Sequence, residues 1–150
     1  MKDKRQAIAI VGLLATIAAA VYMVVQLNGQ ERAPAGDFTN AATAEVRDAQ
    51  GQVVLRGLFA LTDEEDDDIE RSANLEPTGI DADAGGEAEV EFSKAAATEQ
   101  EIEFSVRNLE VGGMFTFVID GVDVAMATAD RRGRAEVELD VPIPGATPSR

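Results

Sequence analysis

The chain after residue 41 is dominated by an alternation of apolar and polar residues with a period of two. In residues 101–107, EIEFSVR, the apolar Ile102, Phe104 and Val106 alternate with charged or polar neighbours. The same alternation recurs in residues 86–92, GEAEVEF. A period of two predicts β-strands that turn one face to the core and the other to water.

Further strand-like segments complete an all-β pattern. Residues 51–59, GQVVLRGLF, are apolar on both faces, which predicts a more deeply buried strand. Residues 114–119 and 122–129 flank Asp120-Gly121, which predicts a hairpin with a type I′ turn, because both central residues of that turn need positive φ. Seven or eight strands within about 100 residues, with frequent turns, predict an antiparallel β-sandwich of immunoglobulin-like type.

A phrase that begins D-x-x-G occurs three times, from Asp48, Asp83 and Asp130. Asp at the first position of a type I turn accepts hydrogen bonds from the amides ahead of it, and Gly at the fourth position takes the positive φ that follows. We therefore interpret all three phrases as turns. An EF-hand calcium loop fails at residues 81–92, because its fifth position is Gly and its twelfth is Phe, which cannot coordinate.

Two segments are ambiguous. Residues 61–77 begin with a capping-box pattern, which favours a helix, yet the alternation from Ile69 to Leu75 fits a short strand after an acidic loop somewhat better. Residues 94–100, KAAATEQ, fit a helical turn between two strands.

An uncharged, predominantly apolar segment occupies residues 7–27. Its 21 residues would span roughly 30 Å as a helix, the thickness of a bilayer's hydrocarbon core. Three basic residues precede it, so the positive-inside rule predicts a cytoplasmic N-terminus and export of the rest. The alternative is a cleaved signal peptide with an Ala-x-Ala site at 18–20 or 33–35, although the apolar stretch is longer than usual for one.

We predict that the chain has five parts. They are a cytoplasmic N-terminus (1–6), a transmembrane signal-anchor helix (7–27), a linker (28–41), an acidic β-sandwich domain (42–143) and a disordered tail (144–150). The linker is predicted from its Gly, Pro, Asn and charged residues. The domain would then lie outside a cell membrane, in a periplasmic or extracellular space.

The predicted exported part is strongly acidic. Of the 28 acidic residues only Asp3 precedes the apolar segment, and of the 13 basic residues three do, so 27 acids and 10 bases follow it, a net charge of −17. This charge repels nucleic acid and anionic lipid headgroups, so we expect no nucleic-acid partner. It favours an envelope protein of basic character as the partner.

Most residue types of catalytic sites are missing. The chain contains no His and no Cys, no Ser within G-x-S-x-G, and no Gly-rich phosphate loop followed by Lys. With 27 exported acids, a carboxylate pair at a glycosidase-like separation would arise by chance. We therefore expect a non-catalytic module without a cofactor and identify no catalytic residue.

The acidic run at residues 63–68 is the strongest local candidate for a site. Its members offer oxygen ligands to a weakly bound Ca²⁺ ion. They are Asp63, Glu64, Glu65, Asp66, Asp67 and Asp68. The alternative is a solvated loop that self-repulsion keeps extended. A Ca²⁺-responsive acidic module is therefore the second function that the sequence suggests.

Charge on the predicted strand faces raises a further question. The solvent faces of residues 87–91, 101–103 and 136–140 carry acids, and like charges would oppose each other if any two of these strands were neighbours. We favour the interpretation that these strands lie on different sheets, that Arg107 and Arg134 space them, or that the acids guard strand edges against aggregation. The alternative is one acidic face that binds cations or basic protein.

The third D-x-x-G phrase carries the one basic spot, formed by Arg131, Arg132 and Arg134. An isolated, solvated loop is the simplest interpretation. The alternative is that it docks on the acidic face of another copy, a head-to-tail contact that would cause weak self-association.

Residues 46–59 and 118–139 resemble bacterial exported β-sandwich modules, in which such turn phrases recur, but they contain no motif of one particular family. We expect a membrane-anchored, exported, non-catalytic module for binding or structural interaction at the cell envelope.

Overall fold

The computed structural model describes residues 36–65, 68–94 and 98–145, and for residues 63–65 it describes the backbone alone. These residues form nine β-strands and no helix. The strands are β1 (Thr43–Arg47), β2 (Val53–Leu58), β3 (Ala60–Glu65), β4 (Asp68–Pro77), β5 (Gly85–Ser93), β6 (Glu99–Arg107), β7 (Met114–Ile119), β8 (Val122–Thr128) and β9 (Ala135–Pro142).

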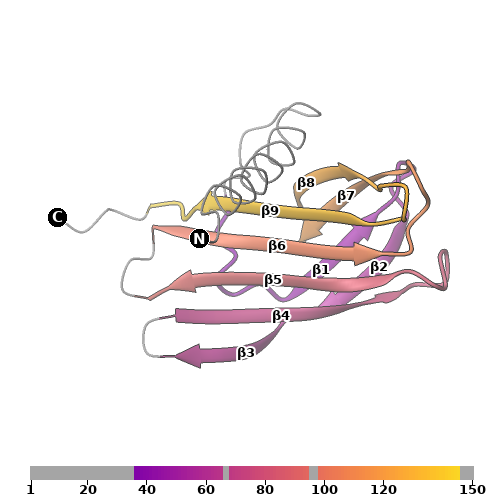
Figure 1. Cartoon of the computed structure of the whole chain (residues 1–150). Coiled ribbons are helices and arrows are strands. Elements are labelled where there is room, and N and C mark those ends of the chain that lie inside the picture. The colour runs from indigo at the N-terminus through magenta and orange to yellow at the C-terminus, as the bar shows by residue number, and fades with distance from the viewer. Residues whose placement is uncertain (1–35, 66–67, 95–97, 146–150) are drawn as a thin grey trace, which may run out of the picture. The chain divides into compact units, whose positions relative to one another are not determined.

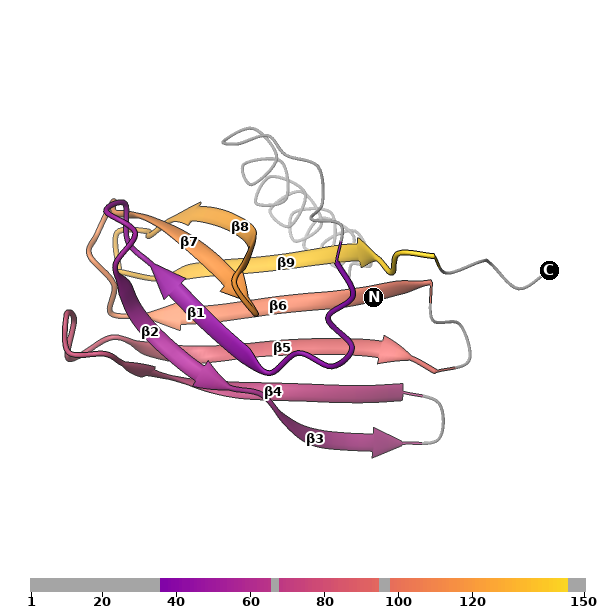
Figure 2. The same ribbon diagram turned by 180° about the vertical axis from the view of Figure 1, so that it is seen from behind.

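The strands form one continuous antiparallel sheet in the order β8-β7-β1-β2-β4-β5-β6-β9, with β3 pairing with β4 off this path. The sheet folds back on itself (Figures 1 and 2). A first layer contains β8, β7, β1 and β2, and a second layer contains β3, β4, β5, β6 and β9. Because β8 and β9 approach each other at the ends of the order, the sheet is nearly closed and barrel-like.

The all-β, antiparallel fold predicted from the alternation is confirmed. Nine strands are present where seven or eight were expected, since the ambiguous segment 61–77 contributes to both β3 and β4. The strand predicted from Ile69 to Leu75 is therefore confirmed, whereas residues 63–65 of the expected acidic loop belong to β3. The two layers are hydrogen-bonded to each other through β2 and β4, so the sheet is more continuous than two separate sheets would be.

The join between the layers is short and depends on a glycine. β2 pairs with β4 through two residue pairs, at residues 55–56 and 76–77. A Cβ atom at Gly57 would lie 2.4 Å from the carbonyl oxygen of Asn74, a distance that no side chain tolerates. Glycine at this position therefore lets β2 lie close against β4 where the sheet passes from one layer to the other.

The two layers share one hydrophobic core. Phe104 of β6 and Phe117 of β7 meet edge to face across it, with ring centroids 5.1 Å apart and an interplanar angle of 62°. The buried apolar positions of β5, β6 and β9 are Ala88, Val90, Ile102, Phe104, Val106, Ala135, Val137 and Val141. These are positions that the alternation predicted to face inward.

The predicted deep burial of residues 51–59 is right only in part. Val54 and Leu55 are buried in the core. Leu58 is 73% exposed, because it lies opposite Thr43 on the outer face of the first layer. Val54 and Leu55 are both buried although they are adjacent, because the register between β1 and β2 shifts beside them, whereas Leu58 lies on the exposed face.

Two of the three D-x-x-G phrases form the predicted turn. In the phrase from Asp48, the N–H of Gly51 donates to the Asp48 carbonyl, and one carboxylate oxygen of Asp48 accepts the N–H groups of Gln50 and Gln52 at 2.9 and 2.8 Å. The phrase from Asp130 has the same bonds at the same offsets. The fourth-position glycines have φ of 78° and 69°.

The interpretation of the third phrase, from Asp83, as a turn of this kind is wrong. Gly85 and Gly86 belong to β5. A Cβ atom at Gly86 would lie 2.4 Å from the carbonyl oxygen of Ser105, so glycine here serves the close approach of β6 rather than a positive φ.

The Asp120-Gly121 hairpin has the predicted type I′ turn, with φ of 48° at Asp120 and 81° at Gly121. The Asp120 carboxylate also accepts the backbone N–H groups of Ala42 and Thr43 at 3.1 and 2.8 Å. In return, the N–H of Asp120 donates to the Thr43 carbonyl at 3.0 Å. These bonds fasten the hairpin to the start of β1.

The segment before β1 is part of the packed domain. Phe38 and Ala41 are buried. The side chain of Gln100, itself buried, accepts the N–H of Phe38 at 2.8 Å and donates to the Gly36 carbonyl at 2.6 Å. The linker predicted for residues 28–41 was therefore too long at its C-terminal end.

Some predictions concern residues outside those described. They are the N-terminus (1–6), the signal-anchor helix (7–27), residues 28–35 of the linker, residues 66–67 of the acidic run, residues 95–97 of the predicted helical turn, and the tail from residue 146. In the part of the chain that the structure describes, no helix has the length and apolar character needed to cross a membrane.

We expect Phe104→Ala to lower the free energy of unfolding by about 3–5 kcal/mol, because it removes a buried ring and leaves a cavity between the layers. Urea denaturation of residues 31–150, which cluster as one compact unit, measures this change. Leu58→Ala is the control, with an expected change within about 0.5 kcal/mol at an exposed position. Equal effects of the two substitutions would contradict the assignment of inner and outer faces.

Candidate functional site

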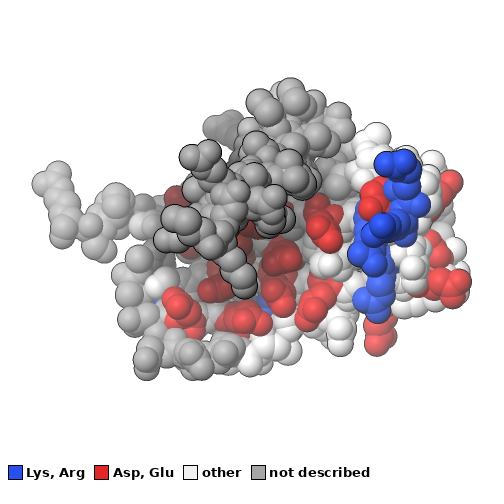
Figure 3. All heavy atoms as spheres, in the orientation of Figure 1, with Lys and Arg blue, Asp and Glu red and all other residues white. Residues whose placement is uncertain are grey.

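Acids on four neighbouring strands gather on the outer side of the second layer, and nine of them lie in its central part. They are Glu70 on β4, Glu87, Glu89 and Glu91 on β5, Glu101 and Glu103 on β6, and Glu136, Glu138 and Asp140 on β9. Each alternates with inward-facing residues such as Val90, Ile102 and Val137, which are buried. Alternation therefore places all nine on the same side of the sheet, which we call the acidic face (Figure 3).

The strand register sets these acids directly opposite one another. One row runs across four strands, through Glu70, Glu91, Glu101 and Asp140. A second row runs across three strands, through Glu89, Glu103 and Glu138. Side chains directly opposite each other on antiparallel strands have Cβ atoms about 4.5–5.5 Å apart. The two rows thus bring like charges into repeated close contact.

This arrangement overturns the interpretation favoured from the sequence, in which the acidic strand faces lay on different sheets or were spaced by arginines. β5, β6 and β9 are consecutive neighbours in one layer. Arg107 ends β6 and Arg134 precedes β9, so both lie at one end of the acidic face rather than among its acids. The sequence could not reveal this, because β9 reaches β6 only after the β7–β8 hairpin has contributed to the other layer.

Sequence reasoning also missed Glu70 as a member of the acidic face. The signal was present, since the alternation from Ile69 to Leu75 places Glu70 on the outer side once that segment is a strand. The sequence did not show which residue lies opposite Glu70. Only the register of β4 against β5, which pairs Glu70 with Glu91, joins Glu70 to a row of acids.

Crowding on the acidic face disfavours ionisation. The pKa of Glu89 is raised above its ordinary value, first by partial burial and then by repulsion from four neighbouring glutamates. The pKa of Glu101 is raised by partial burial and then by repulsion, the largest part of which comes from Glu138. The fold therefore holds these carboxylates where their charge is unfavourable.

A glutamate on the first layer has the opposite environment. Glu45 of β1 forms ion pairs with Arg47 and Arg56, each at 2.7 Å. Burial raises the pKa of Glu45, but the hydrogen bonds and charges of the two arginines outweigh burial, so this pKa is lowered overall. In residues 36–145, apart from the stretches not described, no ion pair of this kind reaches the acidic face.

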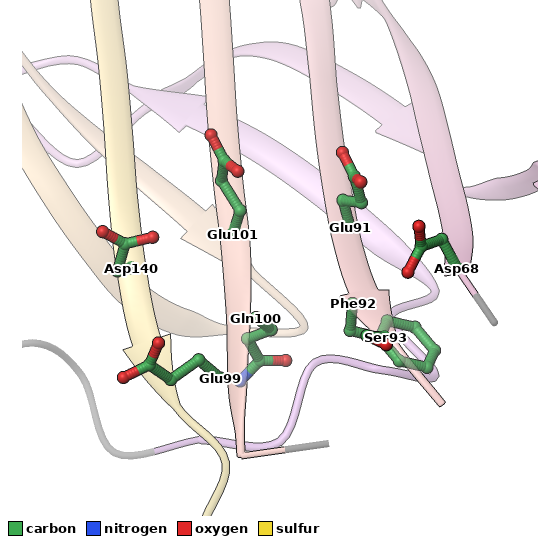
Figure 4. A pocket seen from close by; sticks show the side chains of 8 residues that line it. All are labelled: Asp68, Glu91, Phe92, Ser93, Glu99, Gln100, Glu101 and Asp140. Atoms are coloured by element: carbon green, nitrogen blue, oxygen red, sulfur yellow. The ribbon is translucent and has the colours of Figure 1, made fainter. Parts of the chain in front are cut away.

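A shallow depression of about 200 Å³ lies at one end of the acidic face (Figure 4). The residues that line it are Asp68, Glu91, Phe92, Ser93, Glu99, Gln100, Glu101 and Asp140. Figure 4 shows the carboxylates of Glu91, Glu101 and Asp140 on three different strands. Among the described residues no three acids are grouped so that they could hold a metal ion. The spacing suits several cationic groups of a larger partner better than one bound ion.

The predicted cation loop lies mostly outside the described side chains. The backbone of residues 63–65 ends β3, and residues 66–67 are not described. Asp68 begins β4, is exposed, and lies opposite Ser93 at the margin of the depression. The divalent-cation site at Asp63, Glu64, Glu65, Asp66, Asp67 and Asp68 therefore stays a prediction.

Four exposed arginines gather at the other end of this layer. Arg131, Arg132 and Arg134 lie on the turn between β8 and β9, and all three are exposed, as is Arg107 at the end of β6. Figure 3 shows basic groups in one stripe beside the acidic surface. The outer side of the second layer is therefore electrostatically polarised along its strands.

Comparison of the chain with protein-family models, with curated proteins and with solved structures finds no match. Its function must therefore be argued from the chemistry of its surfaces. Two surfaces of the described residues each carry charge of a single sign on backbone held by strands and turns. One is the acidic face, and the other is the basic stripe formed by Arg107, Arg131, Arg132 and Arg134.

We expect the double substitution Glu89→Gln/Glu101→Gln to stabilise the domain at neutral pH. Because the folded-state pKa of both groups lies above the ordinary value of 4.5, their unfavourable effect is absent below that pH and grows as pH rises through the raised values. Each relieved pair of like charges is worth about 0.2–1 kcal/mol, reduced further by solvent and salt.

Urea denaturation between about pH 3 and about pH 8 tests this expectation, because this range extends to both sides of the ordinary pKa of a glutamate. The gain in stability should be largest at the upper end and should disappear at the lower end. Glu110→Gln is the control, since Glu110 is an exposed loop residue outside the acidic face. A gain that does not change with pH would show that loss of charge repulsion is not its cause.

Proposed function

We propose that the chain is a membrane-anchored, exported, non-catalytic module whose acidic face binds a basic protein at the cell envelope. The observation that carries this proposal is the register of β4, β5, β6 and β9, which sets the acids in two rows on one face. The raised pKa of Glu89 and of Glu101 supports it, because charge that disfavours the folded domain becomes favourable once a cationic partner covers it.

The chemistry of the acidic face favours protein cations over other ligands. Carboxylates spaced by the separation of neighbouring strands, about 4.8 Å, match a spread of Lys and Arg side chains on a partner surface. Such complementarity raises the rate of association and selects against acidic partners. The same field repels nucleic acid and anionic lipid, in agreement with the composition of the chain.

The rest of the proposal follows from the sequence. Residues 7–27 would anchor the chain as a single-pass signal anchor, with residues 1–6 in the cytoplasm and the domain outside the membrane. The absence of His and Cys from the chain supports a binding rather than a catalytic role. We also assign the two-layer architecture to the immunoglobulin-like sandwiches, a finer classification than the antiparallel sheet itself.

We expect an oligoarginine peptide to bind residues 31–150 with an affinity that falls as salt is raised, because the attraction is electrostatic. The triple substitution Glu101→Gln/Glu103→Gln/Glu138→Gln should weaken binding by roughly 3- to 140-fold, at about 0.2–1 kcal/mol for each of the exposed pairs lost. Fluorescence anisotropy of a labelled peptide measures the affinity.

The matched control is Asp81→Gln/Glu110→Gln/Asp123→Gln, which removes the same number of charges from positions off the acidic face. If both triple variants lose affinity equally, net charge alone attracts the peptide and the acidic face is not a specific surface. If neither variant loses affinity, the proposal is wrong.

The second candidate is a Ca²⁺-responsive module that uses residues 63–68. It is favoured by the position of Asp68, which places the start of β4 at the margin of the acidic depression. Oxygen ligands with flexible geometry suit Ca²⁺ at the weak affinities common in extracellular modules.

We expect this second candidate, if correct, to raise the melting temperature of residues 31–150 in a saturable way with millimolar Ca²⁺. Calcium at about 100 times its dissociation constant would add about 2.7 kcal/mol to the free energy of unfolding. Mg²⁺ and NaCl at matched ionic strength are the controls, and Asp66→Asn/Asp67→Asn/Asp68→Asn should abolish the effect. Equal shifts of the melting temperature in all three salts would show that the ions only screen repulsion between the acidic residues, and the Ca²⁺ site would be ruled out.

A further inference from the structure

We propose that the turn carrying Arg131, Arg132 and Arg134 docks on the acidic face of a second copy of the chain. We call this turn the arginine hairpin, although its flanking strands β8 and β9 pair with β7 and β6 and lie at opposite ends of the strand order. The inference rests on the proposed function, because it names a partner for the same acidic face. It follows from three properties of the arginine hairpin: its rigidity, its unpaired charges and its distance from the acids of its own molecule.

Backbone hydrogen bonds hold the arginine hairpin rigid. The Asp130 carboxylate accepts the N–H groups of Arg132 and Arg134 at 2.7 and 2.9 Å. The N–H of Leu109 donates to the Gly133 carbonyl at 2.9 Å, which ties the turn to the loop after β6. A turn fixed in this way presents its side chains to a partner with little loss of backbone entropy.

The arginines of this turn form no ion pair in the part of the chain that the structure describes. The pKa of Asp130 in the same turn is lowered first by the backbone N–H groups of Arg134 and Arg132 and then by the charges of these two arginines. Arg47 and Arg56 pair with Glu45, and the Nε–H of Arg71 donates to the Thr39 carbonyl at 2.9 Å. No such contact involves Arg131, Arg132 or Arg134 within residues 98–145 or with the other described ranges. Unpaired guanidinium groups in so acidic a molecule are available for a second molecule.

The strand geometry keeps the arginine hairpin away from most of its own acidic face. Arg134 and Asp140 are six residues apart along one extended strand, about 20 Å, which is beyond the reach of an arginine side chain. Figure 3 shows the basic groups in one stripe beside the acidic surface. The charges that complement the far acidic rows must therefore come from another molecule.

The contact would be head to tail, because it joins two different surfaces of identical chains. Each copy carries both surfaces, so the contact is heterologous and propagates into open chains unless the rotation closes. The net charge of −15 on every copy opposes the approach. Association should therefore be weak in dilute solution and stronger where copies are concentrated in one membrane plane.

Disulfide trapping tests this contact on the full-length chain in detergent micelles, because the chain has no cysteine of its own. One chain carries Arg131→Cys on the arginine hairpin, and the other carries Ser105→Cys, an exposed position flanked by Glu87 and Glu136 on the acidic face. After mild oxidation of the mixture we expect cross-linked heterodimers in clear excess over the mixture of Arg131→Cys with Leu58→Cys. Leu58 is exposed on the other layer and is the matched control.

Charge reversal decides whether the arginines direct the contact. Adding Arg132→Glu/Arg134→Glu to the Arg131→Cys chain should reduce the heterodimer to the level of the Leu58→Cys control. When this charge-reversed chain is mixed with a Ser105→Cys chain that also carries Glu103→Arg/Glu138→Arg, the heterodimer should form again. A heterodimer no more abundant than the control, or one that survives the hairpin reversal alone, would overturn the inference.

Oligoarginine binding separates this inference from the proposed function. If the wild-type acidic face binds oligoarginine and no hairpin-to-face heterodimer forms, self-docking is wrong while the acidic face remains a docking surface for another basic protein. If oligoarginine does not bind, the proposed function itself fails.

Discussion

The contact between Phe104 and Phe117 across the core is the interaction on which the other features of this domain depend. It joins β6 of the second layer to β7 of the first, with ring centroids 5.1 Å apart. β6 also lies at the centre of the acidic face, where repulsion between Glu101, Glu103 and their neighbours acts to separate β5, β6 and β9. The buried apolar side of the same strands offsets that repulsion, so the electrostatic surface exists because the core behind it is well packed.

Three groups of carboxylates illustrate how local partners decide what an acidic residue does. Asp48, Asp120 and Asp130 accept backbone N–H groups and set turns. Glu45 is neutralised by two arginines on the first layer. Among the described residues, the acids of the acidic face have neither kind of partner, and the pKa values of Glu89 and Glu101 are raised. These carboxylates are therefore available to interact with a cationic partner.

Acidic and basic residues are separated on the outer side of the second layer, so a basic partner would bind at one part of this surface and an acidic partner at the other. Acids occupy most of its outer side, and arginines occupy the end where β8 turns into β9. The buried Gln100 and the carboxylate of Asp120 hold the first residues of the domain to β6 and to the β7–β8 hairpin. The charged outer side therefore lies on a domain whose N-terminal segment is held in place by its own hydrogen bonds.

The alternation of residues was sufficient to determine the antiparallel β class and the inward set on β5, β6 and β9. The turn residues determined three turns, at Asp120-Gly121 and at the D-x-x-G phrases of Asp48 and Asp130. These properties are local, because side-chain parity and turn φ depend on residues a few positions apart. The tertiary structure alone decided that β9 pairs with β6, that Glu70 joins the acidic face, and that Gly86 serves strand packing rather than a turn. Each of these depends on which strands become neighbours, and strand neighbours far apart in the chain are chosen by burial of the whole core rather than by any local pattern.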